Sequence, residues 1–115
     1  MHQPLPAPWD TYALDSDEVK NAYQYFTMQM VDFFQPDYLV IGIEVNLLLN
    51  NAPELWPRYV ALHQFAFDAL KVSYPALPIS VSIVSNAFFP DSSPESKLED
   101  QLAGLSDLAP FLDVV

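Results

Sequence analysis

The sequence contains no cysteine, and its 115 residues include only two glycines and four basic side chains. The absence of cysteine excludes a disulfide scaffold and any metal site built on thiolates. With glycine present only as Gly42 and Gly104, there is no glycine-rich phosphate-binding loop. The two histidines do not have the spacing of a metal site. We therefore expect neither a metal nor any other cofactor.

Positive charge is scarce, and the formal net charge at pH 7 is −11. Nucleic-acid binding requires Lys and Arg to neutralise phosphates, and anionic membranes attract the same side chains, so neither is an expected partner. No apolar run reaches the ~18 to 20 residues needed to span a bilayer. The acidic surplus is typical of a solvated surface and by itself indicates no particular function.

The chain is rich in hydrophobic residues (51%) and aromatic residues (14%), which excludes a disordered segment. Apolar periodicity predicts helices over about 15–34, 54–73 and 95–105, the first opened by an Asp15–Glu18 capping box. Short apolar runs predict strands over 38–46 and 79–86 and the start of a third at 111–115. Proline-rich stretches predict loops at 1–11 and 88–94 and a turn at 50–53. Strands that alternate with helices favour a parallel sheet.

Side chains alternate across a strand, so each predicted strand divides into two sets. One set is entirely branched aliphatic and suits packing under helices: Leu39, Ile41, Ile43 and Val45 in the first strand, and Ile79, Val81 and Ile83 in the second. The other set is smaller or more polar and includes Gly42, Glu44, Asn46, Ser80, Ser82 and Asn86. This division fits a barrel, with the second set facing the bore, better than an open sheet covered by helices on both faces.

Three parallel strands cannot close a barrel. A third strand that stopped at Val114-Val115 would also leave a hydrophobic edge uncovered, which natural domains avoid. The expected fold class is therefore α/β, with residues 1–115 as a single partial domain of about three βα units of a parallel (β/α)₈ barrel, not closed. Self-association through open sheet edges is expected. A complete small flavodoxin-like domain is the alternative, although it would normally show five strands.

Glu44 is the strongest candidate for a catalytic residue. An ionisable group inside an apolar strand costs several kcal/mol unless it is paired or exposed at a strand end. Glu44 lies near the carboxyl end of its strand, where barrel enzymes place catalytic groups. The alternative is a structural glutamate bonded to polar neighbours.

Three further residues are candidates for contacts with a sugar substrate. Asn46 and Asn86 lie near the ends of their predicted strands and could bond sugar hydroxyls, or could cap the following turns. Phe88 could stack on a sugar ring, or could pack in the core. Both interpretations of each residue stay open on the sequence alone.

Residues 36–46, Pro-Asp-Tyr-Leu-Val-Ile-Gly-Ile-Glu-Val-Asn, resemble the fourth-strand segment of retaining glycoside hydrolases with (β/α)₈ barrels. The nearest match is the arabinogalactan endo-β-1,4-galactanase-like group. The Trp56-Pro57 helix opening, the strand from Pro78 and the last four residues, 112–115, follow the same order. The resemblance implies that the chain runs from the third helix to the start of the sixth strand.

The resemblance implies that Glu44 is the general acid/base of a hydrolase acting on β-linked polysaccharide or oligosaccharide. In the family an Asn that contacts the sugar precedes this Glu; here the position is Ile43, which the alternation turns away from the bore. Retaining hydrolysis needs two carboxyl groups about 5 to 5.5 Å apart. The nucleophile would come from a seventh strand beyond Val115, so this segment alone should be inactive.

The resemblance also allows a secreted or periplasmic parent protein. The second functional hypothesis is a non-catalytic α/β domain that binds sugar or another protein. It predicts a cooperative, monomeric fold for residues 1–115 with the C-terminal valines paired in the sheet.

Overall fold

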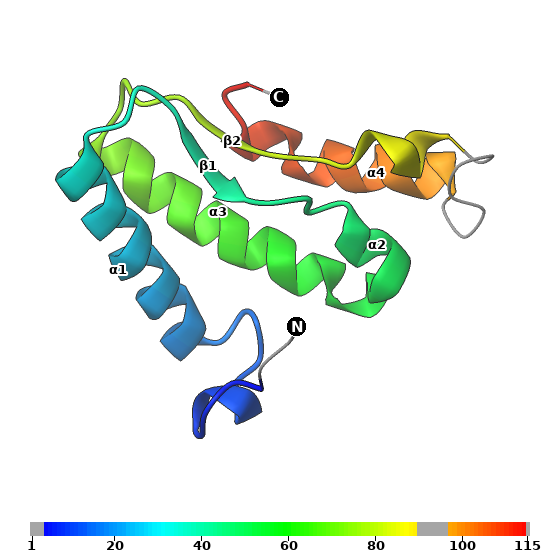
Figure 1. Ribbon diagram of the computed structural model, residues 1–115, viewed down its shortest axis with the longest axis horizontal. Coiled ribbons are helices and arrows are strands. Elements are labelled where there is room, and N and C mark those ends of the chain that lie inside the picture. The colour runs from blue at the N-terminus through cyan, green and yellow to red at the C-terminus, as the bar shows by residue number, and fades with distance from the viewer. Residues whose placement is uncertain (1–3, 90–96, 115) are drawn as a thin grey trace.

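The computed structural model describes residues 4–89 and 97–114. The helices are α1 (Asp17–Phe34), α2 (Leu47–Asn51), α3 (Trp56–Ser73) and α4 (Leu98–Leu108), and the strands are β1 (Leu39–Gly42) and β2 (Ile79–Val81). Short 3₁₀ helices cover Trp9–Thr11 (η1), Pro53–Leu55 (η2), Ser85–Phe88 (η3) and Ala109–Phe111 (η4). The protein is thus mixed α/β and mostly helical (Figure 1). No helix in this part of the chain is long and apolar enough to cross a membrane.

The first helix begins and ends at clear local signals. The backbone N–H of Val19 donates to Ser16 Oγ at 3.3 Å, so Ser16 is the N-cap, and the predicted Asp15–Glu18 capping box is wrong by one residue. The acidic side chains of the first turn, Asp17 and Glu18, interact favourably with the positive end of the helix dipole. The helix ends at Gln35, which adopts a left-handed conformation with φ 47° before Pro36.

The two strands pair in parallel, with α3 as the crossover between them. Leu39 lies opposite Ile79, and Val40 opposite Ser80. The register then shifts, so that Gly42, not Ile41, lies opposite Val81. This irregularity has the character of a β-bulge, which inserts one extra residue in one strand and reverses the alternation beyond it.

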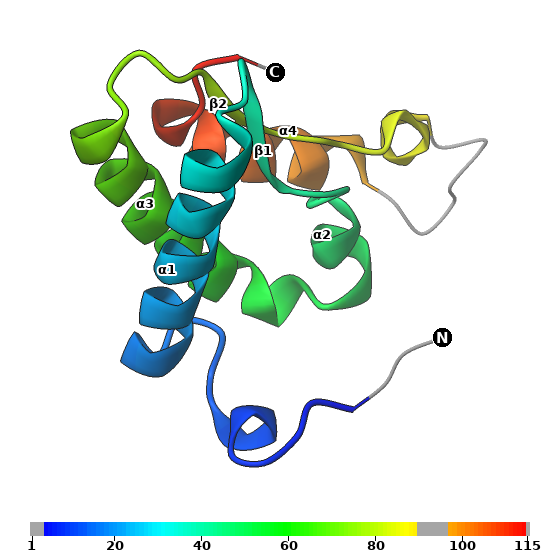
Figure 2. The same ribbon diagram turned by 60° about the vertical axis from the view of Figure 1, so that its left-hand side comes forward.

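One face of the two-stranded sheet lies against helices, and α3 contacts both α1 and α4 (Figures 1 and 2). A first core cluster joins α1, α3 and the beginnings of both strands: Val31, Ile41, Ala66, Leu70, Leu77 and Ile79. A second joins the carboxyl ends of the strands to the start of α3 and the end of α4: Val45, Trp56, Val81 and Leu108. Burial of each valine, leucine and isoleucine side chain in these clusters stabilises the fold by roughly 1.5 to 3 kcal/mol.

The other side of β1 remains exposed in the described part of the chain. Tyr38 is 69% exposed and Val40 is 48% exposed, although both belong to an apolar run. Tyr38 and Val40 alternate in step with Gly42 and Glu44 and belong to the set predicted to face away from the helices. Up to Val40 the structure agrees with that prediction. The sheet is not a closed barrel.

Both predicted strands are too long. β1 ends at Gly42, because the bulge and the left-handed residue Glu44 turn the chain into α2. β2 ends at Val81, residues 82–84 belong to no helix or strand, and η3 begins at Ser85 within the predicted strand. The short helix α2 was not predicted, since 50–53 was expected to form a turn. The predicted loop at 88–94 and the start of the helix at 95 fall largely on 90–96, outside the described residues.

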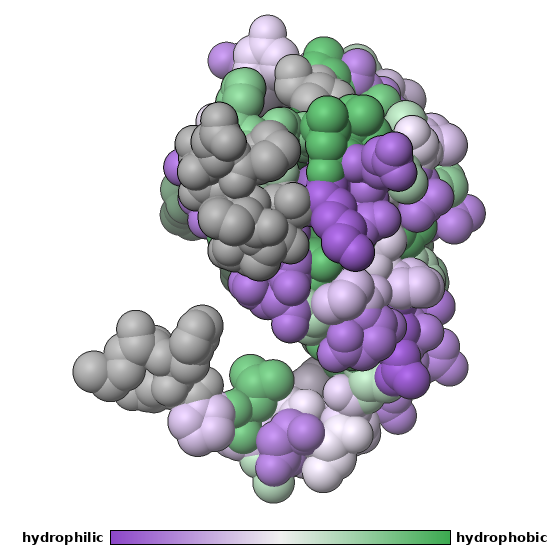
Figure 3. Space-filling model, turned by 90° about the vertical axis from the view of Figure 1, so that its right-hand side faces the viewer, coloured by the Kyte–Doolittle hydropathy of each residue, from purple (hydrophilic) through white to green (hydrophobic). Residues whose placement is uncertain are grey.

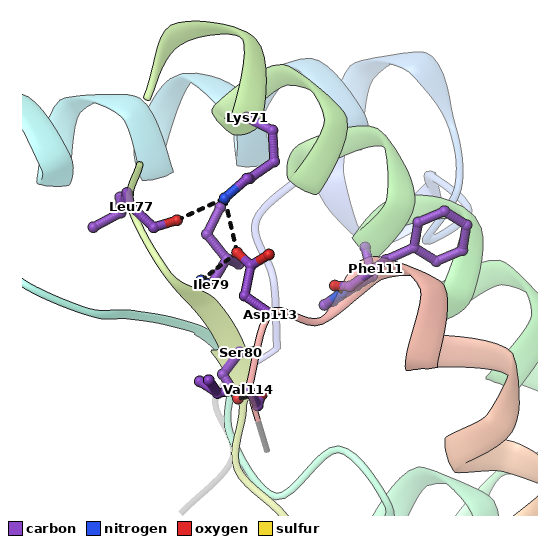
Figure 4. Close-up of polar contacts among 8 residues, drawn as sticks. Lys71, Leu77, Ile79, Ser80, Phe111, Asp113 and Val114 are labelled. Atoms are coloured by element: carbon purple, nitrogen blue, oxygen red, sulfur yellow. Dashed lines mark hydrogen bonds and ion pairs between the residues drawn. The ribbon is translucent and has the colours of Figure 1, made fainter. Parts of the chain in front are cut away.

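The predicted third strand is not formed as a strand within residues 111–114. The chain there nevertheless follows the free edge of β2, because Asp113 N donates to Ile79 O at 2.9 Å. Asp113 Oδ2 in turn accepts from Ile79 N at 2.9 Å and from Lys71 Nζ at 2.9 Å (Figure 4). The hydrogen bond from Lys71 is the main reason that the pKa of Asp113 is lowered. A side-chain carboxylate thus takes one of the positions that a neighbouring strand would fill.

Candidate functional site

Glu44 lies two residues beyond the carboxyl end of β1 and is exposed. Its φ is +52°, in the left-handed region that residues other than glycine seldom occupy. This conformation costs on the order of 1 kcal/mol and persists only where the surroundings enforce it. The apolar environment expected from the sequence is therefore absent, and Glu44 projects from a strained turn at the strand end.

Ser82, the residue directly after β2, enforces this turn. Its Oγ accepts a hydrogen bond from Glu44 N at 2.8 Å, and its carbonyl accepts one from Val45 N at 3.1 Å. Its own N–H donates to Gly42 O at 2.9 Å. Three hydrogen bonds from one residue thus fix the backbone on both sides of Glu44. The alternation along the sequence puts Ser82 in the polar set of its predicted strand. It does not reveal this contact, because the contact joins residues 38 positions apart.

The bulge changes which residues face the helices. A Cβ added to Gly42 would meet the Tyr59 hydroxyl, so position 42 faces α3 and not the open side. Ile43 is 72% exposed, although the alternation placed it under the helices. The expectation for both residues is wrong for one reason: the extra residue at the bulge reverses the sides. Ile43 therefore lies at the surface next to Glu44.

Asn46 is completely buried and belongs to a cluster of amide side chains. Its Nδ2 donates to Val84 O at 2.9 Å and to Gln101 Oε1 at 3.0 Å, and its Oδ1 accepts from Val84 N at 2.8 Å. Gln101, also fully buried, donates to Asn46 O at 3.2 Å and to Asn50 Oδ1 at 3.0 Å. The Asn46 amide thus pairs with the backbone of Val84 as another strand would, and makes no side-chain cap of α2. Its predicted contact with a sugar stays a prediction and would require this cluster to open.

Asn86 and Phe88 lie in η3, which packs against α4. Asn86 is exposed, and its carbonyl accepts from Phe89 N at 3.0 Å. Phe88 is half-buried, whereas the next residue, Phe89, is 59% exposed. Asn86 thus remains free to meet a ligand from solvent. The Phe88 ring is therefore less accessible than the Phe89 ring for the predicted stacking on a sugar.

Glu44, Asn46, Asn86 and Phe88 line none of three pockets of comparable size in the described part of the chain. One of about 490 Å³ lies between α2 and α4, close to the amide cluster, and is lined by Asn50, Trp56 and Asp107 among others. Hydrophilic and hydrophobic side chains are mixed on that side of the molecule (Figure 3). A second, of about 470 Å³, lies at the opposite end of the sheet beside Asp32 and Tyr74. Glu44 therefore stands on an open surface.

His63 is fully buried in the middle of α3. Its Nε2 lies 2.7 Å from Phe111 O, and its Nδ1 lies 3.4 Å from the Tyr59 hydroxyl. A neutral ring that donates from Nε2 satisfies the first contact and leaves Nδ1 to accept from Tyr59. Desolvation by burial lowers the pKa of His63, which keeps the ring neutral.

Within residues 4–89 and 97–114, no group of three or more His, Cys, Asp or Glu side chains could hold a metal ion. The chemistry available at the carboxyl ends of the strands is that of a single exposed carboxyl group on a fixed backbone, flanked by hydroxyl and amide groups. Comparisons of the chain with protein-family models, with curated proteins and with solved structures found no match.

Proposed function

We propose that this chain is part of a (β/α)₈-barrel glycoside hydrolase that acts on β-linked polysaccharide or oligosaccharide, with Glu44 as its general acid/base. The observation that carries the proposal is the placement of Glu44. It follows a parallel strand at its carboxyl end, is exposed, and is held in a strained conformation by Ser82. Strained residues that are enforced by their surroundings cluster at functional sites. The resemblance of residues 36–46 to the fourth-strand segment supports the same residue.

The arrangement of layers supports the barrel. Helices cover one face of β1, and the opposite side is exposed at Tyr38 and Val40. In a (β/α)₈ barrel the helices form the outer ring and the other face turns toward the bore. The C-terminal segment follows the edge of β2 that is opposite to β1, where the next strand of a barrel would lie. Further strands would then bury the side chains that are now exposed.

In this proposal Glu44 acts twice. It first donates its proton to the glycosidic oxygen as the bond to the anomeric carbon breaks, while a carboxylate nucleophile attacks that carbon from the other face. It then removes a proton from the water that hydrolyses the glycosyl ester. The resemblance places the nucleophile on a later strand, outside this chain. Ser82 acts as a positioning residue, because it fixes the backbone that carries the acid.

The test is an assay of the gene product expressed with its flanking coding sequence, using β-1,4-linked galactan and other β-linked oligosaccharides. Glu44→Gln should lower kcat by about 10²- to 10⁴-fold, since it removes the transferable proton and leaves the shape of the side chain. Glu54→Gln is the matched control, because Glu54 is also exposed and belongs to η2. If Glu44→Gln retains the wild-type rate on every cleaved substrate, the assignment of Glu44 is wrong.

A non-catalytic binding domain is the second candidate. It is favoured by Ile43, an exposed aliphatic side chain where the resembling family has a sugar-binding Asn. Such a domain would bind β-linked oligosaccharides without cleaving them, or would bind another protein through its apolar surface. Titration of residues 1–115 with β-1,4-galactotriose, followed by NMR, would show saturable shifts around Glu44. Full-length protein that binds but never cleaves would favour this candidate.

A further inference from the structure

A pocket of about 560 Å³ lies in the helical layer, away from the residues of the proposed catalytic site. Three segments form its walls: the chain before α1, one side of α1, and the start of α3. Its volume falls within the range of about 300 to 1,000 Å³ that is typical of small-molecule sites. Figure 3 shows the described N-terminal segment projecting from the lower end of the molecule, where it forms the outer wall.

The lining is mainly aromatic and aliphatic. Trp9 and Tyr12 meet edge to face with their ring centroids 5.4 Å apart, and Tyr23 and Phe26 from α1 lie on the other side. Burial raises the pKa of Tyr23 to about 12, so this phenol stays neutral at physiological pH. Rigid rings of this kind offer a large contact area to a planar or hydrophobic molecule at a low entropic cost.

Among the described residues, Arg58 is the only charged one that lines the pocket. The chain has 15 acidic residues and four basic ones, yet none of the acidic side chains in residues 4–89 and 97–114 lines this pocket. Arg58 Nη1 forms an ion pair with Asp15 Oδ1 at 3.9 Å, a distance longer than a hydrogen bond, and both side chains are partly exposed, Arg58 by half. Its planar guanidinium remains able to bond a carboxylate in a bidentate manner.

We propose that this pocket binds a small hydrophobic molecule that carries one anionic group, of the aromatic-carboxylate type. The aromatic walls hold the hydrophobic body, and Arg58 pairs with the acid at the rim. An anion is the ligand that this lining favours, because Arg58 would repel a cation and no lining carboxylate could hold one. The site is independent of Glu44, so its test is separate from that of the proposed hydrolase activity.

The test uses 2-naphthoate as the probe, with 2-naphthylmethanol as its neutral analogue, and follows the two indole N–H resonances by NMR. The indole of Trp9 should shift on titration with 2-naphthoate. That of Trp56 should not, because it is bonded to Asp107 Oδ2 and lies outside this pocket. Arg58→Gln should weaken the binding of 2-naphthoate about fivefold, which is the effect expected from the loss of one ion pair at a half-exposed site. It should leave the affinity for 2-naphthylmethanol unchanged.

Two variants complete the design. Ala22→Phe, at an exposed position on the α1 wall, should fill the pocket and weaken both probes. Lys20→Gln is the matched control for charge, since it removes one positive charge from α1 outside the lining, and it should leave both affinities unchanged. Absence of a Trp9 shift at millimolar 2-naphthoate would overturn the site. Equal affinity for 2-naphthylmethanol would overturn the anionic class.

Discussion

Gly42 shows how a single missing side chain fixes the relation between β1 and α3. The Tyr59 hydroxyl occupies the space that a Cβ at position 42 would need, and Val45 closes the same space from the other side. The Tyr59 ring also stands beside Trp56, with centroids 5.6 Å apart, so it cannot move freely. Burial raises the pKa of Tyr59 above its ordinary value. The glycine is therefore required by a close approach and not by a positive φ.

Gly42→Ala should destabilise the protein by about 1 to 3 kcal/mol, the usual cost of an overpacked core position. Urea unfolding followed by circular dichroism measures the change. In the double variant Gly42→Ala with Tyr59→Phe, the loss relative to Tyr59→Phe alone should be smaller, because the hydroxyl that clashes is gone. Equal losses in both backgrounds would show that the hydroxyl is not the obstacle.

Asn46 and Asn86, both predicted to bind sugar, differ in burial: Asn46 is fully buried and Asn86 is exposed. Asn46→Ala should cost about 2 to 4 kcal/mol in the free energy of unfolding, since it removes the hydrogen-bond partner of Val84 N and of the buried Gln101 Oε1. Asn86→Ala should change it by less than about 0.5 kcal/mol, because Asn86 is exposed. Thermal melts of the two variants give a direct comparison. A small effect of Asn46→Ala would mean that the amide cluster is not needed for the fold.

At the scale of elements, α3 and η4 are joined by His63. A neutral His63 satisfies Phe111 O and Tyr59, whereas a protonated ring must place a charge in a buried position. The folded protein therefore binds this proton more weakly than the unfolded chain, whose histidine has its ordinary pKa of 6.5. The unfolded state takes up protons first as the pH falls, so stability is lost below about pH 6.5.

We expect the free energy of unfolding to fall between pH 6.5 and 5 in wild type, and to fall less in His63→Gln. Glutamine can still donate to Phe111 O but does not titrate. Urea denaturation at a series of pH values measures both slopes. The other histidine, His2, lies outside the described residues. His2→Gln is the comparison variant, and an equal change of slope in His2→Gln would contradict the assignment to His63.

Much of the arrangement of elements could be predicted from the sequence, because the signals for α1 and α3 are local: apolar periodicity and flanking prolines. The strand ends could not be predicted, because an apolar run does not reveal a bulge or a left-handed residue. Gln101 was missed for a related reason. A glutamine in an amphipathic helix carries no local mark of burial, and its partner Asn46 lies 55 residues away.

At the scale of the molecule, the uncovered side of β1 makes self-association the expected behaviour of residues 1–115. Ile43 is the most exposed aliphatic residue near the strand end, so Ile43→Asn should weaken association with little loss of stability. Val72→Asn is the matched control, because Val72 is 84% exposed but lies on α3. Analytical ultracentrifugation measures the self-association of both variants. Equal effects of the two changes would exclude the open side of the sheet as the contact surface.

The triple contact made by Ser82 has a kinetic consequence. The amide hydrogens of Glu44 and Val45 are both donated to Ser82, so they can exchange with solvent only when the segments that follow β1 and β2 separate there. Glu44 is an exposed residue and should therefore combine an accessible carboxyl group with a slowly exchanging amide. In a Ser82→Ala protein the Glu44 amide should exchange much faster, while the Val45 amide, bonded to a main-chain carbonyl, stays slow. The backbone that carries this carboxyl group is therefore fixed before a ligand binds, and binding needs no rearrangement of the main chain.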